Sequence, residues 1–482
     1  MIIHLNFLPK PGETGAGEVL ASLFALADQG RLDPELLPHL RLHLDWIQYR
    51  ANFREPVTVR HATDAQGGRM ALAELAVDLR RVPRDGLIDG LGGALASVGA
   101  VERETPAKIV IEDWAPLGQS TIWQFNRLFW QRLGDWERES GRGFETALPS
   151  GRSDANDPAA VADAVADFWT LLVELDKRGQ LPAEIFALEI GVGSGTRAGL
   201  WLDRFKALDE ARATGFYPRL RFLLADYSLP TLDRAMSAVD AHRGVVSMIA
   251  TDALNPLRAL SFLRYKILYV HLTNVYDNLP VDELVRRDGQ LYLVETRAYL
   301  PDPAARAIAT AYGVAPAELR PTIARLLETG PDLFGDRPRG VAFWRAVWDG
   351  LCLEERLRHL EGTADVPLPA GLHGDDLDEL LASAPADVRF HISRGAVESF
   401  VNTVPLLHPR GYLQVQDIFV ATMDEYRQGF RGPGKLDGSV VNWVNGALLR
   451  AVGARTGYDV HFAPFRYRPG SRTSILYTTL RE

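Results

Sequence analysis

Three glycines at alternate positions follow a carboxylate in the stretch FALEIGVGSGTRAGLWL, residues 186–202. The apolar run before the glycines predicts a strand, and the run after them predicts a helix. Glycine lets a ligand lie against bare backbone, and a helix N-terminus offers N–H groups without an intrahelical partner. We therefore expect Glu189, Gly191, Gly193 and Gly195 to bind a nucleotide-like cofactor, with a purely structural turn as the alternative.

The spacing of these glycines separates the classes of nucleotide site. A phosphate-binding loop of the Walker type needs a Gly-Lys-Ser/Thr sequence, and no lysine is present in this stretch. A dinucleotide fingerprint needs glycine at its first, third and sixth positions, but the sixth position here is Thr196. Both classes are therefore disfavoured, and with them a nicotinamide-dependent dehydrogenase.

Two more acidic residues follow the next apolar runs. Asp226 ends the second run, where an acid can accept hydrogen bonds from both hydroxyls of a ribose. Tyr227 beside it could pack on an adenosine, or equally be a surface aromatic residue. Asp252 and Ala253 follow the third run, although an acid there would by itself more often cap a helix. Together with Glu189, these residues occupy successive strand ends and predict one cofactor site.

The fourth apolar run ends in a polar segment that could carry the reaction. His271 lies within this run, and Asn274 and Asp277 follow it. We expect the acceptor of the reaction beside Asn274, with Asp277 as the general base or the group that orients the acceptor. His271 is the second candidate because its usual pKa suits proton transfer, but a histidine in a buried strand is more often a core residue with satisfied hydrogen bonds.

The order Glu189-x-Gly191-x-Gly193-x-Gly195 resembles motif I of the class I S-adenosylmethionine methyltransferases. The resemblance implies S-adenosyl-L-methionine as the cofactor and methyl transfer to an acceptor held after the fourth strand. It also implies that Glu189 lies by the cationic methionine part, and that the acid at the third strand end meets the adenine amino group. The leaving group of this cofactor is already activated, so such an enzyme chiefly aligns the reactants and removes a proton.

A second likeness begins after the fourth run, at NVYDNLPV, residues 274–281. This segment is similar to the MidA-like methyltransferases, which include protein arginine methyltransferases of respiratory complex I assembly. Asp417 in QVQDIF and the segment PGKLDGSVVNW, residues 433–443, extend the likeness. The resemblance covers roughly 185–300 and 405–480 and implies that the chain is a methyltransferase with a protein acceptor.

One position departs from the MidA-like pattern. The family has a glutamate where this chain has Val275, and a carboxylate is what would hold a guanidinium by paired hydrogen bonds. Asp277 or Glu295 could replace that glutamate. The acceptor therefore stays open between a protein side chain and a small biosynthetic molecule, and a cofactor-binding assembly or scaffold protein with little turnover is the further alternative.

The order of apolar runs predicts an α/β fold. Five runs with helices between them indicate a doubly wound, Rossmann-like parallel sheet, and two alternating runs around RPGSR add a C-terminal antiparallel hairpin, for seven strands. We expect an N-terminal mixed α/β region at 1–155, the first part of the cofactor-binding core at 156–297, a mostly helical insertion at 298–405 and the last part of the core at 406–482.

Three segments of the N-terminal region carry helix predictions. Apolar spacing favours helices in HLRLHLDWIQYR, residues 39–50, and in GRMALAELAVDLRRV, residues 68–82. STIWQFNRLFWQRLGDW, residues 120–136, predicts a strongly aromatic helix. Its rings could line a pocket, but aromatic packing against the next domain explains them as well.

Two further segments could shape the acceptor site. Trp344 and Trp348 of the insertion, with the aromatic helix, could enclose a small or lipid-like acceptor, whereas an open groove would favour a protein. The glycine-rich segment at 427–439 could close over the site as a lid, or be a simple exposed turn.

The composition excludes several function classes. The net charge of −9 argues against a general nucleic-acid binder, because such binding relies on cationic contacts. The single cysteine, Cys352, excludes an internal disulfide and a cysteine-based metal cluster, and we expect no metal. No apolar stretch approaches the ~20 residues of a membrane span, and the start of the chain lacks a signal-peptide pattern. We expect a cytoplasmic bacterial protein whose partner is a methyl acceptor, and a homodimer is possible.

Overall fold

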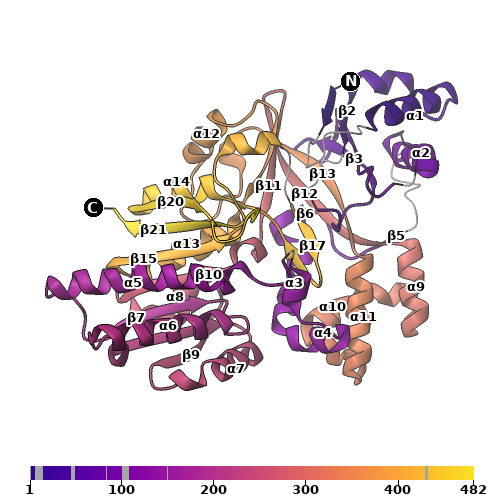
Figure 1. Ribbon diagram of the computed structural model, residues 1–482. Helices are drawn as coiled ribbons and strands as arrows, with labels where there is room; N and C mark the ends of the chain where they lie inside the picture. Colours follow the sequence, from indigo (N-terminus) through magenta and orange to yellow (C-terminus); the bar gives the residue numbers. More distant parts are fainter. Residues whose placement is uncertain are drawn as a thin grey trace.

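The computed structural model contains two large β-sheets joined by a shared core (Figure 1). It describes residues 2–5, 15–44, 49–82, 84–99, 108–148, 150–428 and 432–481.

One sheet has seven strands in the order β20-β21-β15-β10-β7-β8-β9. Neighbouring strands from β15 to β9 are parallel, whereas β21 runs antiparallel to β15 and forms a hairpin with β20. In this register Glu189 of β7 lies opposite His271 of β10, so the glycine motif and the fourth strand meet at one edge. The strands are β7 (Ile185–Ile190), β8 (Leu220–Asp226), β9 (Val246–Ala250), β10 (Ile267–Thr273), β15 (Leu407–Asp417), β20 (Tyr458–Pro464) and β21 (Ser474–Leu480).

Helices cover both faces of the seven-stranded sheet. Alternate side chains of β7 explain this arrangement, because Ala187 packs among residues of one set of helices and Leu188 among residues of another. The first set is α5 (Pro158–Lys177), α6 (Thr196–Arg212) and α7 (Leu229–Ala238). The second set is α8 (Pro256–Leu260), α13 (Arg394–Thr403) and α14 (Gly446–Thr456). Helices on both faces of a mainly parallel sheet define the α/β class.

The second sheet was not expected from the sequence. It has ten strands, with the main order β1-β2-β4-β3-β13-β12-β11-β14 and with β5 and β6 both paired to β12. The N-terminal region supplies six of these strands, and the chain after β10 supplies the other four. They are β1 (Ile2–Leu5), β2 (Leu40–Leu44), β3 (Val57–Thr63), β4 (Arg69–Val77), β5 (Lys108–Val110), β6 (Ala115–Pro116), β11 (Asp282–Arg287), β12 (Gln290–Pro301), β13 (Cys352–Leu360) and β14 (Val388–Ile392).

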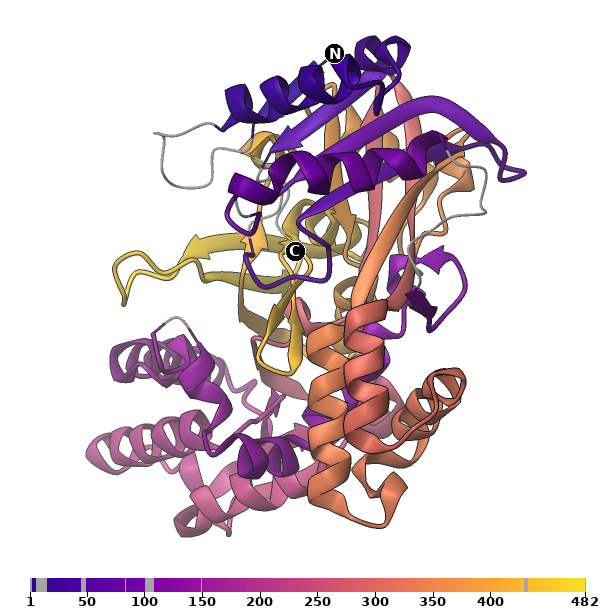
Figure 2. The same ribbon diagram turned by 90° about the vertical axis from the view of Figure 1, so that its right-hand side faces the viewer.

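Two groups of helices accompany the second sheet. The helices α1 and α2 pack on its N-terminal strands and lie at the end of the molecule away from the seven-stranded sheet (Figure 2). The others connect the two sheets or cover the second sheet's other end. The helices are α1 (Ala16–Asp28), α2 (Leu87–Gly99), α3 (Ile122–Gln131), α4 (Leu133–Ser140), α9 (Asp302–Tyr312), α10 (Leu319–Thr329), α11 (Arg337–Gly350) and α12 (Gly374–Ala382).

The helix predictions at 39–50 and 68–82 are wrong, because β2 and β4 occupy the described parts of these segments. The leucines of β2 alternate and pack against α1 and α2, which is a period of two and not of 3.6. The polar residues between them are also buried: Arg41 lies 2.7 Å from a carboxylate oxygen of Asp387, and His43 lies 3.3 Å from Glu74. Both faces of β2 are buried, and one of them carries charged and polar side chains. The usual alternation of buried apolar and exposed polar residues, by which a strand is identified from sequence, is therefore absent.

The insertion after β10 is largely helical, but it also contains β13 and β14. Its helices α9 to α11 pack against α3 and α4 around a cluster of aromatic side chains. Trp344 and Trp348 are fully buried in this cluster, and the ring of Trp344 lies 4.7 Å from that of Trp136. Both tryptophans are therefore core residues. Within the described part of the chain, no helix is both long and apolar enough to cross a bilayer.

The segment proposed as a lid is a packed hairpin where the structure describes it. β17 (Gly434–Leu436) and β18 (Ser439–Val441) pair with each other, and the ammonium of Lys435 donates to the carbonyls of Trp348 and Leu351 at 2.6 and 2.9 Å. These carbonyls end α11, so Lys435 caps that helix. Residues 429–431 lie outside the described residues, and the hairpin is neither a free lid nor an exposed turn. A short parallel pair, β16 (Phe419–Val420) and β19 (Val444–Asn445), lies nearby in the chain.

Candidate functional site

A cavity of about 450 Å³ lies at the carboxyl ends of β7, β8, β9 and β10, which is within the size range of small-molecule sites. The helix α3 and residues of the segments 144–148 and 153–156 supply its opposite wall. Most of the predicted site residues line this cavity: Glu189, Gly191, Gly193, Asp226, Tyr227, Asp252, Ala253 and Asn274. Gly195, His271 and Asp277 are not part of its wall.

The three glycines serve two different purposes. All have positive φ values, of 75°, 53° and 78° for Gly191, Gly193 and Gly195. A Cβ on Gly191 would meet Val275 at 2.5 Å, and one on Gly195 would meet the backbone of Ala235 at 2.7 Å, so these two glycines permit the loop to pack. A Cβ on Gly193 would meet no described atom within 4 Å, and this residue faces the cavity. Gly193 therefore leaves backbone open to a ligand.

Glu189 is paired with a cation that the sequence did not single out. Its carboxylate accepts a hydrogen bond from Arg197 at 2.8 Å, and a second nitrogen of Arg197 donates to the Tyr269 hydroxyl at 2.6 Å. Burial raises the pKa of Glu189, and Arg197 offsets part of that shift. Arg197 stands in the first turn of α6, two residues after Gly195, and it also lines the cavity. The wall therefore presents a carboxylate and a guanidinium side by side.

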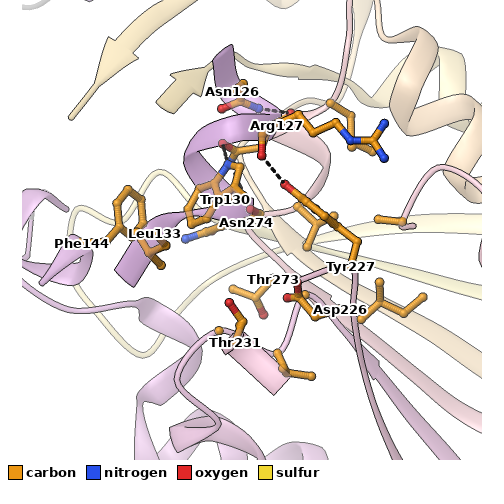
Figure 3. Close-up of a pocket in the computed structure, with 18 of the residues that line it drawn as sticks. Asn126, Arg127, Trp130, Leu133, Phe144, Asp226, Tyr227, Thr231, Thr273 and Asn274 are labelled. Carbon is orange, nitrogen blue, oxygen red and sulfur yellow. Dashed lines mark hydrogen bonds between the residues drawn. The ribbon is translucent and has the colours of Figure 1, made fainter. Parts of the chain in front are cut away.

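Asp226 is partly buried and has spare hydrogen-bonding capacity. The Ser228 amide donates to its carboxylate at 2.9 Å, and burial raises its pKa to about 6. An ionised carboxylate offers about four lone-pair sites, so it can accept further hydrogen bonds such as those of a ribose. The neighbouring Tyr227 hydroxyl donates to the carbonyl of Arg127 at 3.4 Å, which joins β8 to α3 across the cavity (Figure 3).

The end of β9 forms the third part of this edge. Asp252 accepts a hydrogen bond from the Leu254 amide at 3.0 Å, and its other oxygen lies 3.7 Å from a nitrogen of Arg127. Asp252 therefore caps a turn and also faces the cavity. Ala253 is buried in the wall. The hydroxyl of Thr251, also in the wall, is buried and has no hydrogen-bond partner among the described residues. Because buried hydroxyls normally have a partner, this one is available to a bound ligand.

The segment predicted as one aromatic helix, residues 120–136, spans two helices, α3 and the start of α4, and its rings are divided between the two predicted roles. Trp123 and Trp130 line the cavity, and Trp123 is also buried in the core with the insertion, as are Phe125, Phe129 and Trp136. The indole N–H of Trp130 donates to the Asn278 side-chain oxygen at 3.1 Å.

Trp130 marks one end of the cavity. Its ring lies 4.8 Å from that of Phe144, at an angle of 73°. Figure 3 shows Trp130, Leu133 and Phe144 at this end, with Asp226 and Tyr227 at the other. The aromatic end thus faces the loop after β10, and the acidic end faces β8.

The end of β10 brings a polar residue and a buried histidine together. Asn274 has a φ of 49° and lines the cavity, as does Thr273. The Thr273 hydroxyl lies 2.6 Å from Nε2 of His271, and Nδ1 of His271 lies 3.0 Å from the side-chain oxygen of Gln414. Since that oxygen can only accept, the network assigns the proton to Nδ1 and leaves Nε2 to accept from Thr273. Burial lowers the pKa of His271 well below its usual range, so the ring is neutral.

Asp277 is buried and does not line the cavity. Its carboxylate is buried and accepts a hydrogen bond from Asn278 at 2.7 Å, and its carbonyl accepts one from the Asn442 side chain at 2.8 Å. Burial first, and then the nearby Asp417, raise its pKa well above the usual range. Asp417 in turn accepts from the backbone N–H of Tyr276 at 2.9 Å. The geometry assigns both acids to the folding of the loop after β10.

Glu295, the other acid considered for an arginine acceptor, belongs to the second sheet. Its two carboxylate oxygens lie 2.6 and 2.8 Å from nitrogens of Arg356 and Arg358. It does not line the cavity. In the described part of the chain no group of three or more His, Cys, Asp or Glu side chains is arranged to hold a metal ion.

Comparison with known proteins gives structural neighbours only. No protein-family model matches the chain, and no curated protein matches it by sequence. A crystal structure of a protein from Burkholderia thailandensis bound to S-adenosylhomocysteine aligns at 12% identity with a TM-score of 0.45, over 76% of this chain and 88% of that one. The DszA carbon methyltransferase aligns at 12% identity with a TM-score of 0.32, over 97% and 93%. At these values the overlaps do not bear on function, which rests on the geometry of the cavity.

Proposed function

We propose that the protein is an S-adenosylmethionine-dependent methyltransferase. The observation that carries the proposal is the convergence of Glu189, Asp226 and Asp252, from three successive strand ends, on one cavity beside the open backbone of Gly193. In open α/β sheets, ligands bind outside the carboxyl ends of the strands. The acids would meet three chemically different parts of one cofactor.

The residues of the wall fit this cofactor group by group. Glu189 would accept from the ammonium of the methionine part, and Arg197 would bind its carboxylate by charged hydrogen bonds. Asp226 would accept from the ribose hydroxyls, with Tyr227 beside it, and Asp252 would meet the adenine. When bound, the cofactor supplies an electrophilic methyl group on a sulfonium that is already activated as a leaving group.

The chain's own contribution to the reaction would be alignment and proton removal. Asn274 lines the cavity next to Thr273 and would orient the acceptor. The Thr273 hydroxyl donates to His271, so its oxygen is left to accept a hydrogen bond from the acceptor. We assign the proton route to Thr273 and then Nε2 of His271, which lies 2.6 Å from the Thr273 hydroxyl. Asp277 has the less favourable position for a base.

Two alternatives differ from this proposal in measurable ways. A scaffold protein would bind the cofactor without turnover, whereas a dehydrogenase would prefer a dinucleotide. The likeness to the MidA-like family, with a protein arginine acceptor, is a finer assignment and depends on the carboxylate that Val275 replaces. The cofactor proposal does not depend on that assignment.

Thermal unfolding tests the cofactor proposal. S-adenosylhomocysteine at ~100 times its Kd would stabilise the protein by roughly 2.7 kcal/mol, and NAD at the same concentration would not. Incubation with methyl-labelled S-adenosylmethionine and candidate acceptors then tests turnover. A shift with NAD alone would favour a dehydrogenase, and binding without transfer to any acceptor would favour the scaffold.

A further inference from the structure

The end of the cavity near β10 has an apolar, aromatic wall. Trp130 is fixed there by its hydrogen bond to Asn278, and Phe144 packs edge-on against it. Leu279 and Pro280 of the loop after β10 line the same cavity. A cofactor held by the three acids at β7, β8 and β9 would leave this end for the acceptor.

The charged side chains of the wall are already paired. Arg197 lies 2.8 Å from Glu189, Arg234 lies 3.1 Å from Glu137, and Arg127 lies 3.7 Å from Asp252. These three pairs contain every arginine that lines the cavity, and no lysine lines it within the described chain. Arg197 is assigned to the cofactor carboxylate in the proposed function, and the other two arginines pair with Glu137 and Asp252. The wall therefore offers an anionic acceptor no uncommitted cation, and a desolvated charge without a partner binds poorly.

The remaining acids do not provide for a cationic acceptor either. Asp226 is committed to the ribose in the proposed function, and it stands at the opposite end of the cavity from Trp130 (Figure 3). Glu145 lines the cavity and accepts a hydrogen bond from the Asn156 side chain at 3.2 Å. Val275 lines the cavity, and Asp277 does not. Asp277, the acid next along the chain from Asn274, accepts a hydrogen bond from the Asn278 side chain at 2.7 Å and is not part of the described cavity wall, so an arginine or lysine side chain would not meet it there.

We propose that the acceptor is a small, uncharged, planar molecule with a hydroxyl group, bound between the rings of Trp130 and Phe144 and the amide of Asn274. This inference rests on the proposed function and adds the substrate class to it. An oxygen lone pair of the acceptor forms the new O–CH₃ bond as the S–CH₃ bond breaks. The electron pair of that bond neutralises the sulfonium to give S-adenosylhomocysteine, and the hydroxyl proton passes to Thr273 and His271. Aromatic faces and an uncharged amide are the groups that such a molecule requires.

Three probes that share one ring system test the charge preference. They are 2-naphthol, its anionic analogue 6-hydroxy-2-naphthoate and its cationic analogue 6-(aminomethyl)-2-naphthol. Each is titrated calorimetrically into the wild-type protein saturated with S-adenosylhomocysteine. We expect 2-naphthol to bind at least about tenfold more tightly than either charged analogue. Equal or tighter binding of a charged analogue, or no binding of 2-naphthol, overturns the inference.

Two variants locate the binding site. Trp130→Leu removes the ring and should weaken 2-naphthol binding at least about fivefold, whereas Trp130→Phe keeps an aromatic face and should restore most of it. S-adenosylhomocysteine is titrated into each protein first. If it fails to bind the wild type, the proposed function fails and the acceptor class falls with it. If it binds but Trp130→Leu leaves 2-naphthol binding unchanged, or an arginine peptide is methylated instead, only the acceptor class fails.

Discussion

Both sheets hold acidic side chains largely shielded from water, but the groups that surround these side chains differ. In the ten-stranded sheet, Glu355 is surrounded by arginines: Arg54 at 2.6 Å, Arg389 at 2.9 Å and Arg60 at 3.2 Å. In the seven-stranded sheet, Asp226 receives hydrogen bonds from backbone amides and faces a cavity. One environment is complete within the protein, and the other has room for a ligand.

The pKa values of the two acids report this difference. Burial alone would raise the pKa of Glu355, but the three arginines hold it well below its usual range. Burial raises the pKa of Asp226 to about 6, because no arginine offsets it. A buried charge is thus a sign of function only where it borders a cavity. The ten-stranded sheet shows that a dense network of buried charges can be structural.

The largest effect is expected in the ten-stranded sheet, where the buried Glu355 is paired with arginines of the protein itself. Glu355→Gln leaves Arg54, Arg60 and Arg389 with one fewer negative charge in a buried site, and it should lower the free energy of unfolding by about 3–5 kcal/mol. Urea unfolding at pH 7 measures this loss. The matched control is Glu354→Gln, whose side chain is 23% exposed and which should cost about 1 kcal/mol or less. Similar losses for the two variants would break the contrast between the sheets.

The next effect concerns the proton route. Thr273→Val removes the hydroxyl between the cavity and His271, and it should lower kcat roughly 10²-fold while the affinity for S-adenosylhomocysteine changes little. Thr273→Ser keeps the hydroxyl and should retain most of the activity. Single-turnover transfer of a labelled methyl group measures both. A Thr273→Val variant with wild-type kcat would exclude this proton route, and the general base would then be another residue.

Arg197 tests whether the cavity recognises an amino-acid group. Arg197→Met should weaken S-adenosylhomocysteine binding roughly 10- to 100-fold, because charged hydrogen bonds contribute about 1.5–3 kcal/mol. The binding of 5′-methylthioadenosine, which lacks the amino-acid part, should stay within about threefold of wild type. Arg197→Lys retains the charge and should lie between the two proteins. Equal losses for both ligands would assign Arg197 a purely structural role with Glu189.

The smallest effect is a pH dependence at Asp226. Because its pKa of about 6 exceeds the unfolded value of 3.8, the carboxylate is protonated as the pH falls below 6 and loses acceptor capacity. The affinity for S-adenosylhomocysteine should fall about tenfold from pH 7 to pH 5.

The same pKa predicts an opposite effect on stability. The raised pKa makes the folded state favour the proton, so stability from this group is full below pH 3.8 and is lost as the pH rises through 6. Asp226→Asn should therefore keep or raise the Tm at pH 7, while it weakens cofactor binding and abolishes the pH dependence. A lower Tm with unchanged binding would make Asp226 a structural residue like Glu355.

The proposed cofactor edge could be predicted from the sequence because its rules are local. A glycine run between a strand and a helix, and an acid at each strand end, place Glu189, Asp226 and Asp252 together in any parallel sheet. Arg197 was missed because its importance depends on pairing with Glu189 across the glycine turn. The surroundings of Asp277 were also beyond reach, since they depend on a short helical turn after β10 in which its backbone N–H donates to Asp417 and its carboxylate accepts from Asn278.

The second sheet could not be predicted for a different reason. Its strands come from distant parts of the chain, and β3 pairs with β13 almost 300 residues later. Strands such as β2 bury charge on one face, which obscures the alternation of apolar residues. The part of the cavity wall formed by α3 could be predicted only in part. A helix with aromatic side chains all around does not show which face meets a ligand and which meets the core.

A crystal structure with S-adenosylhomocysteine tests the central claim most directly. The account predicts electron density for the ligand in this cavity, with the ribose hydroxyls hydrogen-bonded to Asp226, the amino-acid part against Glu189 and Arg197, and the sulfur directed toward Asn274. An empty cavity at saturating ligand, or density at another site, would contradict it and leave the edge of the seven-stranded sheet without its proposed function.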